Sequence, residues 1–201
     1  LRAPDFYLVV PPPKAMTFGP TGFPAYSAPN TIWTKRRDLT FTWSNPGDAG
    51  SGVHHYEISV NGGAWQPVSS GYSPSLSTGS YTFSFRAVDN MGHTGPVRTF
   101  YTNIDIDGPT ISPVDIYGVA SANANPPWRK SSTVRLRFNS SDLGSGIQVR
   151  KLKWNIGAWV NTTEERTLHL TTGVHTFDMY VTDKVGYSCG IERLHARIDR
   201  E

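Results

Sequence analysis

Apolar and polar residues alternate along several short stretches of the chain. Leu39, Phe41 and Trp43 alternate with Thr40 and Thr42, which places the apolar side chains on one face of a strand. The same period of two is found over residues 56–60, 81–87, 100–104, 134–138, 152–154, 175–181 and 194–198. No segment shows a convincing helical period. One apolar and one polar face per strand predict antiparallel sheets.

The pattern recurs along the chain with a shift of 94 residues. "YEISVNGGAWQPV" (56–68) aligns with "RKLKWNIGAWVNT" (150–162), and "TGSYTFSFRAVDNMG" (78–92) aligns with "TGVHTFDMYVTDKVG" (172–186). "GSG" recurs at the same shift, and an upstream "WTKRRDLTFTW" matches "WRKSSTVRLRF" at a shift of 95. A period near 95 is too long for a solenoid and favours two tandem domains.

These strands and their turns predict an all-β chain with two tandem immunoglobulin-like (fibronectin III-like) antiparallel β-sandwich domains. We expect the first sandwich over 14–107 and the second over 108–201. Residues 1–13 are expected to be a linker or the end of a preceding repeat, because 6–18 aligns with 103–115. The chain is therefore expected to be a piece of a longer array.

The composition agrees with short strands joined by many turns. Hydrophobic residues make up 37% of the chain and aromatic residues 12%, with 19 Gly and 15 Pro. The single cysteine, Cys189, excludes an internal disulfide and is expected to be a small buried residue. No apolar run approaches the roughly 18 residues of a membrane span, so membrane insertion is not expected.

The net charge of +3 is weak evidence for a nucleic-acid partner. Residues 109–201 carry the whole surplus. Arg135 and Arg137 face outward from one strand, and Lys151 and Lys153 from the next. We expect these two strands to belong to different sheets, so that the charges do not form one basic stripe and nucleic acid is not a partner.

The ordered motifs "GSGV", "YEISVNGGAW" and "TGSYTFSFRAVDNMG" resemble bacterial immunoglobulin-like or fibronectin III-like tandem repeats of large extracellular surface proteins. In this chain His93 and Tyr187 replace the Asn that usually ends the Asp-x-x-Gly-Asn turn. The resemblance implies a non-catalytic module, secreted or at the cell surface, that acts as a spacer, stalk or adhesion unit. Its implied partners are flanking domains of the same longer chain.

Two hairpin turns are predicted at corresponding places in the copies. Asn61 and Gly62 form the strongest short signal for a type I′ turn, in which both central residues have positive φ. The second copy has Asn155 and Gly157 at its turn but lacks the double glycine.

Four tryptophans are candidates for a ligand platform or for packing. Trp65 and Trp159 follow the two hairpins, whereas Trp33 and Trp128 each precede a strand. An exposed, coplanar row would indicate stacking on a glycan. Packing is the favoured interpretation, and we expect Trp65 and Trp159 to be at least half covered.

Acidic residues near the domain boundary are candidates for calcium binding. Asp105 and Asp107 alternate there, and Asp89 and Asp48 lie in predicted loops. Carboxylate oxygens are suitable ligands for Ca²⁺, which takes about six to eight oxygen ligands in all. The alternative, which we favour, is a polar turn that ends a strand, with no cofactor.

No catalytic motif is present, so the chain is not expected to be an enzyme. The six histidines form neither a His-Glu-x-x-His pair nor a close Cys/His pair, and no Gly-x-Ser-x-Gly occurs. Three hypotheses follow: a spacer, a module that binds a glycan or a cell-surface protein, and an accessory domain of a secreted enzyme.

Overall fold

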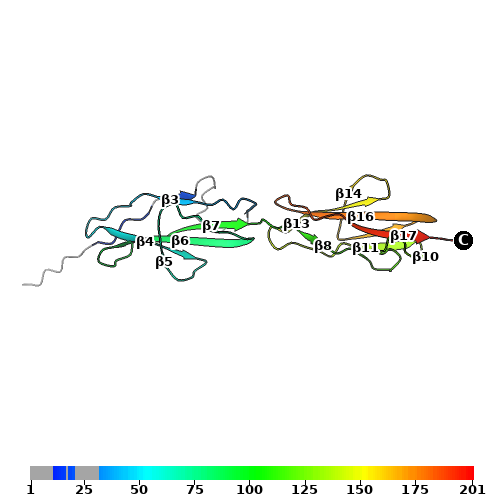
Figure 1. Ribbon diagram of the computed structural model, residues 1–201, viewed down its shortest axis with the longest axis horizontal. Coiled ribbons are helices and arrows are strands. Elements are labelled where there is room, and N and C mark those ends of the chain that lie inside the picture. The colour runs from blue at the N-terminus through cyan, green and yellow to red at the C-terminus, as the bar shows by residue number, and fades with distance from the viewer. Residues whose placement is uncertain (1–10, 17, 21–31) are drawn as a thin grey trace, which may run out of the picture. The chain divides into compact units, whose positions relative to one another are not determined.

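The computed structural model describes residues 11–16, 18–20 and 32–201 (Figure 1). Every regular element among these residues is a β-strand. The chain divides into two compact units, Leu1–Ile104 and Asp105–Glu201. This division lies three residues before the boundary predicted from the sequence. Most of the predicted linker, residues 1–10, lies outside the described residues.

The first unit contains a five-stranded sheet in the order β2-β7-β6-β4-β5 and a two-stranded sheet of β1 and β3. The sheets are antiparallel, except that β2 runs parallel to β7. The strands are β1 (Phe18–Pro20), β2 (Trp33–Thr34), β3 (Phe41–Trp43), β4 (Val53–Val60), β5 (Gln66–Val68), β6 (Gly79–Asp89) and β7 (Arg98–Ile104).

The second unit repeats the five-stranded sheet in the order β10-β17-β16-β13-β14. Opposite it are a three-stranded sheet, β15-β11-β9, and the pair β12-β8. The strands are β8 (Thr110–Ile111), β9 (Val114–Asp115), β10 (Trp128–Arg129), β11 (Thr133–Arg137), β12 (Ser140–Ser141), β13 (Ile147–Trp154), β14 (Val160–Thr162), β15 (Glu165–His169), β16 (Gly173–Asp183) and β17 (Glu192–Ile198).

Each unit buries the apolar face of its strands between the five-stranded sheet and the shorter strands opposite it. In the first unit the ring of Phe41 from β3 lies 5.0 Å from Phe83 and 4.8 Å from Phe85, both on β6. In the second unit Leu136 of β11 is buried in one cluster with Phe177 of β16. The predicted fold class, all-β with immunoglobulin-like sandwiches, is confirmed. The basic strands also lie in different sheets as predicted, since β11 and β13 do not share one.

The strand register shows that the repeat is structural as well as sequential. In the first unit Val53 pairs with Asp89, and the register then shifts before His55. In the second unit Ile147 pairs with Asp183, and the register shifts before Val149. A β-bulge therefore occurs at the same place in both copies, 94 residues apart, where it bends the strand near the loops at its end.

The two hairpin turns differ in one residue. Asn61 and Gly62 have φ values of 51° and 73°, as a type I′ turn requires. In the second copy Asn155 has a φ of 50°, but Ile156 is not among the residues with positive φ. Only Asn155 of this turn has a left-handed backbone conformation. Because position 156 does not need a positive φ, a β-branched isoleucine fits there.

Candidate functional site

A loop that begins at Asp142 forms the first part of an acidic cluster in the second unit. The Asp142 carboxylate oxygen Oδ2 accepts hydrogen bonds from the backbone N–H groups of Gly144 (3.2 Å) and Gly146 (2.6 Å). An aspartate that closes a loop over its own following residues is a standard use of this short side chain. One oxygen of Asp142 is therefore used to shape the loop.

A second loop begins at Asp183, the last residue of β16. Its carboxylate oxygen Oδ1 accepts hydrogen bonds from the N–H groups of Val185 (3.0 Å), Gly186 (2.6 Å) and Tyr187 (2.8 Å). The Asp183 side chain is completely buried. Here too a single carboxylate oxygen accepts the backbone N–H groups of the loop.

Asp105, the first residue of the second unit, brings a third carboxylate to these loops. It is completely buried, and its Oδ2 accepts a hydrogen bond of 2.7 Å from the N–H of Ser145. A Cβ atom at Gly144 would lie 2.6 Å from Oδ1 and 2.7 Å from Oδ2 of Asp105. Glycine at position 144 therefore leaves the space that the Asp105 carboxylate occupies.

The three aspartates converge on one point. Each offers a carboxylate oxygen within 4.8 Å of those of the other two. Asp105 Oδ1, Asp142 Oδ1 and Asp183 Oδ2 are buried and accept no hydrogen bond. Within the part of the chain that the structure describes, no Lys, Arg or His forms an ion pair with any of the three. The cluster is chemically suited to a cation that prefers oxygen ligands.

The structure rearranges the acidic residues singled out in the sequence. Asp105 belongs to the cluster, whereas Asp107 is exposed and Asp89 lies in the other unit. Sequence reasoning missed Asp142 and Asp183. The repeat itself carried a signal for them, because at a shift of 94 they align with Asp48 and Asp89.

Trp65 and Trp159 are partly buried against side chains of their own units. The guanidinium carbon of Arg86 lies 4.2 Å from the centre of the Trp65 ring. The Trp159 ring lies 4.8 Å from the ring of Tyr180 and 5.1 Å from the Lys153 amine. These contacts hold both indoles against the outer face of the larger sheet of their own units.

Trp33 and Trp128 lie on β2 and β10, the two-residue strands that run parallel to β7 and β17 at a sheet edge. Trp33 is partly buried, whereas Trp128 is 54% exposed, with the Arg197 guanidinium carbon 5.7 Å from its ring centre. Of the four candidate tryptophans, Trp128 alone is exposed, so the four do not form an exposed row.

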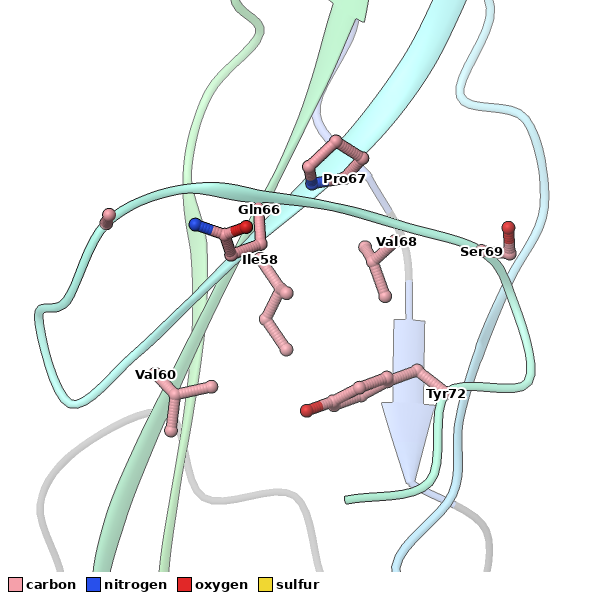
Figure 2. A pocket seen from close by; sticks show the side chains of 8 residues that line it. Ile58, Val60, Gln66, Pro67, Val68, Ser69 and Tyr72 are labelled. Carbon is pink, nitrogen blue, oxygen red and sulfur yellow. The ribbon is translucent and has the colours of Figure 1, made fainter.

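An apolar hollow lies beside each hairpin. Figure 2 shows the one in the first unit, of about 410 Å³, where Ile58, Val60, Val68 and Tyr72 surround the space between β4 and the segment after β5. A smaller hollow of about 290 Å³ lies beside β13 and β14 in the second unit. No charged side chain lines the first hollow; its lining is mainly apolar, with polar groups from Gln66, Ser69 and Tyr72.

Comparisons with known proteins gave structural neighbours only; no protein-family model and no curated protein matches the chain. The chain is similar to the fibronectin(III)-like modules of Clostridium thermocellum CbhA, with 12% identity, coverage of 92% of this chain and 96% of that one, and a TM-score of 0.34. For the D00-D0 domain of intimin the identity is 9%, the coverage 91% and 100%, and the TM-score 0.34. For a 1.5-MDa bacterial ice-binding adhesin the identity is 14%, the coverage 82% and 58%, and the TM-score 0.28.

These neighbours are the kinds of module that the motifs in the sequence resemble. At such identities the similarity concerns the fold alone. Within the described residues, no helix has the length and apolar character that a membrane span requires.

Proposed function

We propose that this chain is a non-catalytic pair of immunoglobulin-like repeats that acts as a spacer, stalk or adhesion module of a larger surface or secreted protein. In this proposal its partners are the flanking domains of that protein, and its place is extracellular. The function is mechanical: each unit resists unfolding through its own core and holds a more distant binding head away from the surface.

The main support for this proposal is that the same sandwich architecture occurs twice in the chain. Both units have the same five-stranded order, the same bulge and the same position of the hairpin tryptophan. Trp65 and Trp159 pack against Arg86 and Tyr180 of their own units. A repeat whose prominent aromatic rings serve its own packing suits a structural role.

Single-molecule pulling on the chain, tethered at its two ends, tests this function. We expect two separate unfolding events, each releasing about 30 nm, since roughly 95 residues extend by about 3.3–3.6 Å each. A chain that extends without a force peak would contradict a load-bearing role. A single unfolding event of twice the length at every pulling speed would contradict the proposal that each unit unfolds on its own.

The second candidate is a binding module for a glycan or a cell-surface protein, and the exposed ring of Trp128 favours it. Trp128 is 54% exposed at a sheet edge, beside the Arg197 guanidinium. An aromatic ring next to a cation is a frequent element of recognition surfaces. Glycan-array binding that is lost in Trp128→Ala would favour this candidate over the spacer.

A further inference from the structure

We propose that Asp105, Asp142 and Asp183 of the second unit together bind one Ca²⁺ ion. This site is independent of the spacer function, because a module of any role could hold a structural cation. The set differs from the one suggested by the sequence, since it excludes Asp107 and Asp89 and draws on two loops and the start of the unit.

The three carboxylates are costly to bury without a cation. Asp105 and Asp183 are completely buried, and one oxygen of each of the three aspartates has no hydrogen-bond donor. A buried carboxylate that has no counter-charge and keeps one oxygen without a donor is unfavourable, and buried charges in proteins are normally paired or bound to metals. Three such groups side by side add mutual repulsion. A bound divalent cation removes both costs.

The two oxygens of each carboxylate have different surroundings. Asp142 Oδ2, Asp183 Oδ1 and Asp105 Oδ2 accept backbone N–H groups, which fixes the orientation of each side chain. The remaining oxygens are the ones without donors. In metal sites, hydrogen bonds of this kind from outside the ligand set hold the ligands in the orientation that binds the metal.

The geometry and the donor type select calcium. Two oxygens that bind one Ca²⁺ at roughly 2.3–2.6 Å lie at most about 5 Å apart. One carboxylate oxygen from each of the three aspartates lies within 4.8 Å of the other two, which satisfies this limit. Zn²⁺ in structural sites favours Cys and His, which this cluster lacks. Mg²⁺ usually keeps several waters and is held by one or two carboxylates, whereas three carboxylates converging here suit the larger ion.

The corresponding loops of the first unit share part of this arrangement, including a buried Asp48 Oδ1 without a hydrogen-bond donor, but among the described residues they do not bring three carboxylates together. Asp48 Oδ2 accepts the N–H groups of Gly50 (3.2 Å) and Gly52 (2.7 Å), so this loop is built in the same way. However, the Oδ2 atom of Asp89 lies 3.0 Å from Nδ1 of His93. The third position is also different, because residues 6–18, which align with 103–115, contain no Asp or Glu. We therefore expect one Ca²⁺ per chain.

Isothermal titration of the metal-stripped 201-residue chain with CaCl₂ tests the site. We expect one Ca²⁺ per chain and a thermal midpoint that rises on the order of 10 °C when Ca²⁺ is about 100 times its dissociation constant. Asp142→Asn is expected to weaken binding at least tenfold, while its amide oxygen can still accept the two glycine N–H groups. Mg²⁺ is expected to bind at least tenfold more weakly than Ca²⁺.

Asp48→Asn is the matched control, because it changes the same loop in the unit without the site, and it should leave Ca²⁺ binding unchanged. Gly144→Ala is a second variant that keeps all three acids but places a methyl group where the Asp105 carboxylate lies; it should also weaken binding. The proposal is overturned if millimolar Ca²⁺ causes neither heat nor a thermal shift in the wild type. It is also overturned if both variants bind as the wild type does, if Asp48→Asn abolishes binding, or if Mg²⁺ binds equally well.

Discussion

The first unit fills its core with aromatic rings at positions where the second unit uses aliphatic side chains. Phe83 and Phe177 occupy the same place and are both completely buried. The aromatic residues of the first core and their aliphatic counterparts are Phe41 and Leu136, Phe85 and Met179, and Phe100 and Leu194. A sandwich of this kind therefore needs apolar volume at alternate positions, but it does not need one particular side chain there.

The first asparagine of the hairpin turn is the same in both units, because its role is more demanding. Asn61 and Asn155 both have a positive φ, and the side-chain oxygen of each accepts the backbone N–H of the neighbouring long strand, from Thr82 and Thr176 (2.8 Å each). Few residues combine tolerance of a left-handed backbone with a short acceptor. At this position the backbone conformation restricts the residue type more than packing does at the core positions above.

On the outer face of the larger sheet the two units differ in residue type. The polar cluster there is charged in the second unit and neutral in the first. In the second unit the buried Asp178 accepts Arg193 Nη2 at 2.9 Å and pairs with Lys153 Nζ at 2.9 Å. The first unit has Ser84, Thr99 and Ser59 at these positions, and the Ser84 and Thr99 hydroxyl oxygens lie 3.1 Å apart. Both solutions satisfy the polar atoms.

The largest expected effect comes from the shared phenylalanine of the two cores. We expect Phe83→Ala and Phe177→Ala each to lower the free energy of unfolding of their own unit by about 3–5 kcal/mol, because each leaves a cavity among close-packed neighbours. Urea unfolding followed by NMR signals of each unit measures the two values. A difference above about 2 kcal/mol would show that the aromatic and aliphatic cores are not equivalent environments.

The hairpin turns give the next largest effect. We expect Gly62→Ile to destabilise the first unit by about 1–3 kcal/mol, because a β-branched residue is strained at positive φ. The reverse change, Ile156→Gly, should cost the second unit no more than about 1 kcal/mol, through backbone entropy. Amide exchange of the two hairpins, compared in one sample, checks both values. Equal costs would contradict the inferred difference between the turns.

Asp178→Asn should have an intermediate effect on the second unit. The hydrogen bond from Arg193 and the ion pair with Lys153 both favour the ionised carboxylate. Hydrogen bonds to charged groups contribute about 1.5–3 kcal/mol, and since Arg193 is largely exposed, solvent screening reduces the expected loss to about 1–2 kcal/mol. Ser84→Ala, which removes one hydroxyl of the neutral cluster, should cost the first unit less than this.

The same aspartate gives a pH dependence with a definite sign. Hydrogen bonding by Arg193, and in addition the Lys153 contact, lowers the pKa of Asp178 against the opposing effect of its burial. A carboxyl whose pKa is lower in the folded state stabilises the fold above its unfolded pKa of about 4, and this contribution is lost as the pH falls further. The difference between wild type and Asp178→Asn should therefore be full at pH 7 and shrink below pH 4. A difference that grows on acidification would contradict this assignment.

The fold could be predicted from the sequence because it depends on local patterns. Alternation placed Phe83, Phe85 and Phe177 in the core, and the repeat predicted a second sandwich with the same hairpin. The repeat pointed to Asp142 and Asp183 one by one, but not to the cluster, because these two and Asp105 are far apart in the chain and meet only when the sandwich closes. Alternation of Asp105 and Asp107 suggested a local site, but it carried no information on which loops face Asp105.

The smallest expected effect concerns the tryptophans at the sheet edges. Trp128 is 54% exposed, whereas Trp33 at the corresponding position is partly buried. We expect Trp128→Ala to change the free energy of unfolding by less than about 0.5 kcal/mol, as for most surface substitutions. Trp33→Ala should cost about 1–2 kcal/mol, since it removes apolar area that is already covered. Thermal unfolding of both variants measures the contrast. A large loss from Trp128→Ala would mean that its ring packs within the unit, and the case for Trp128 as a ligand-binding surface would then fail.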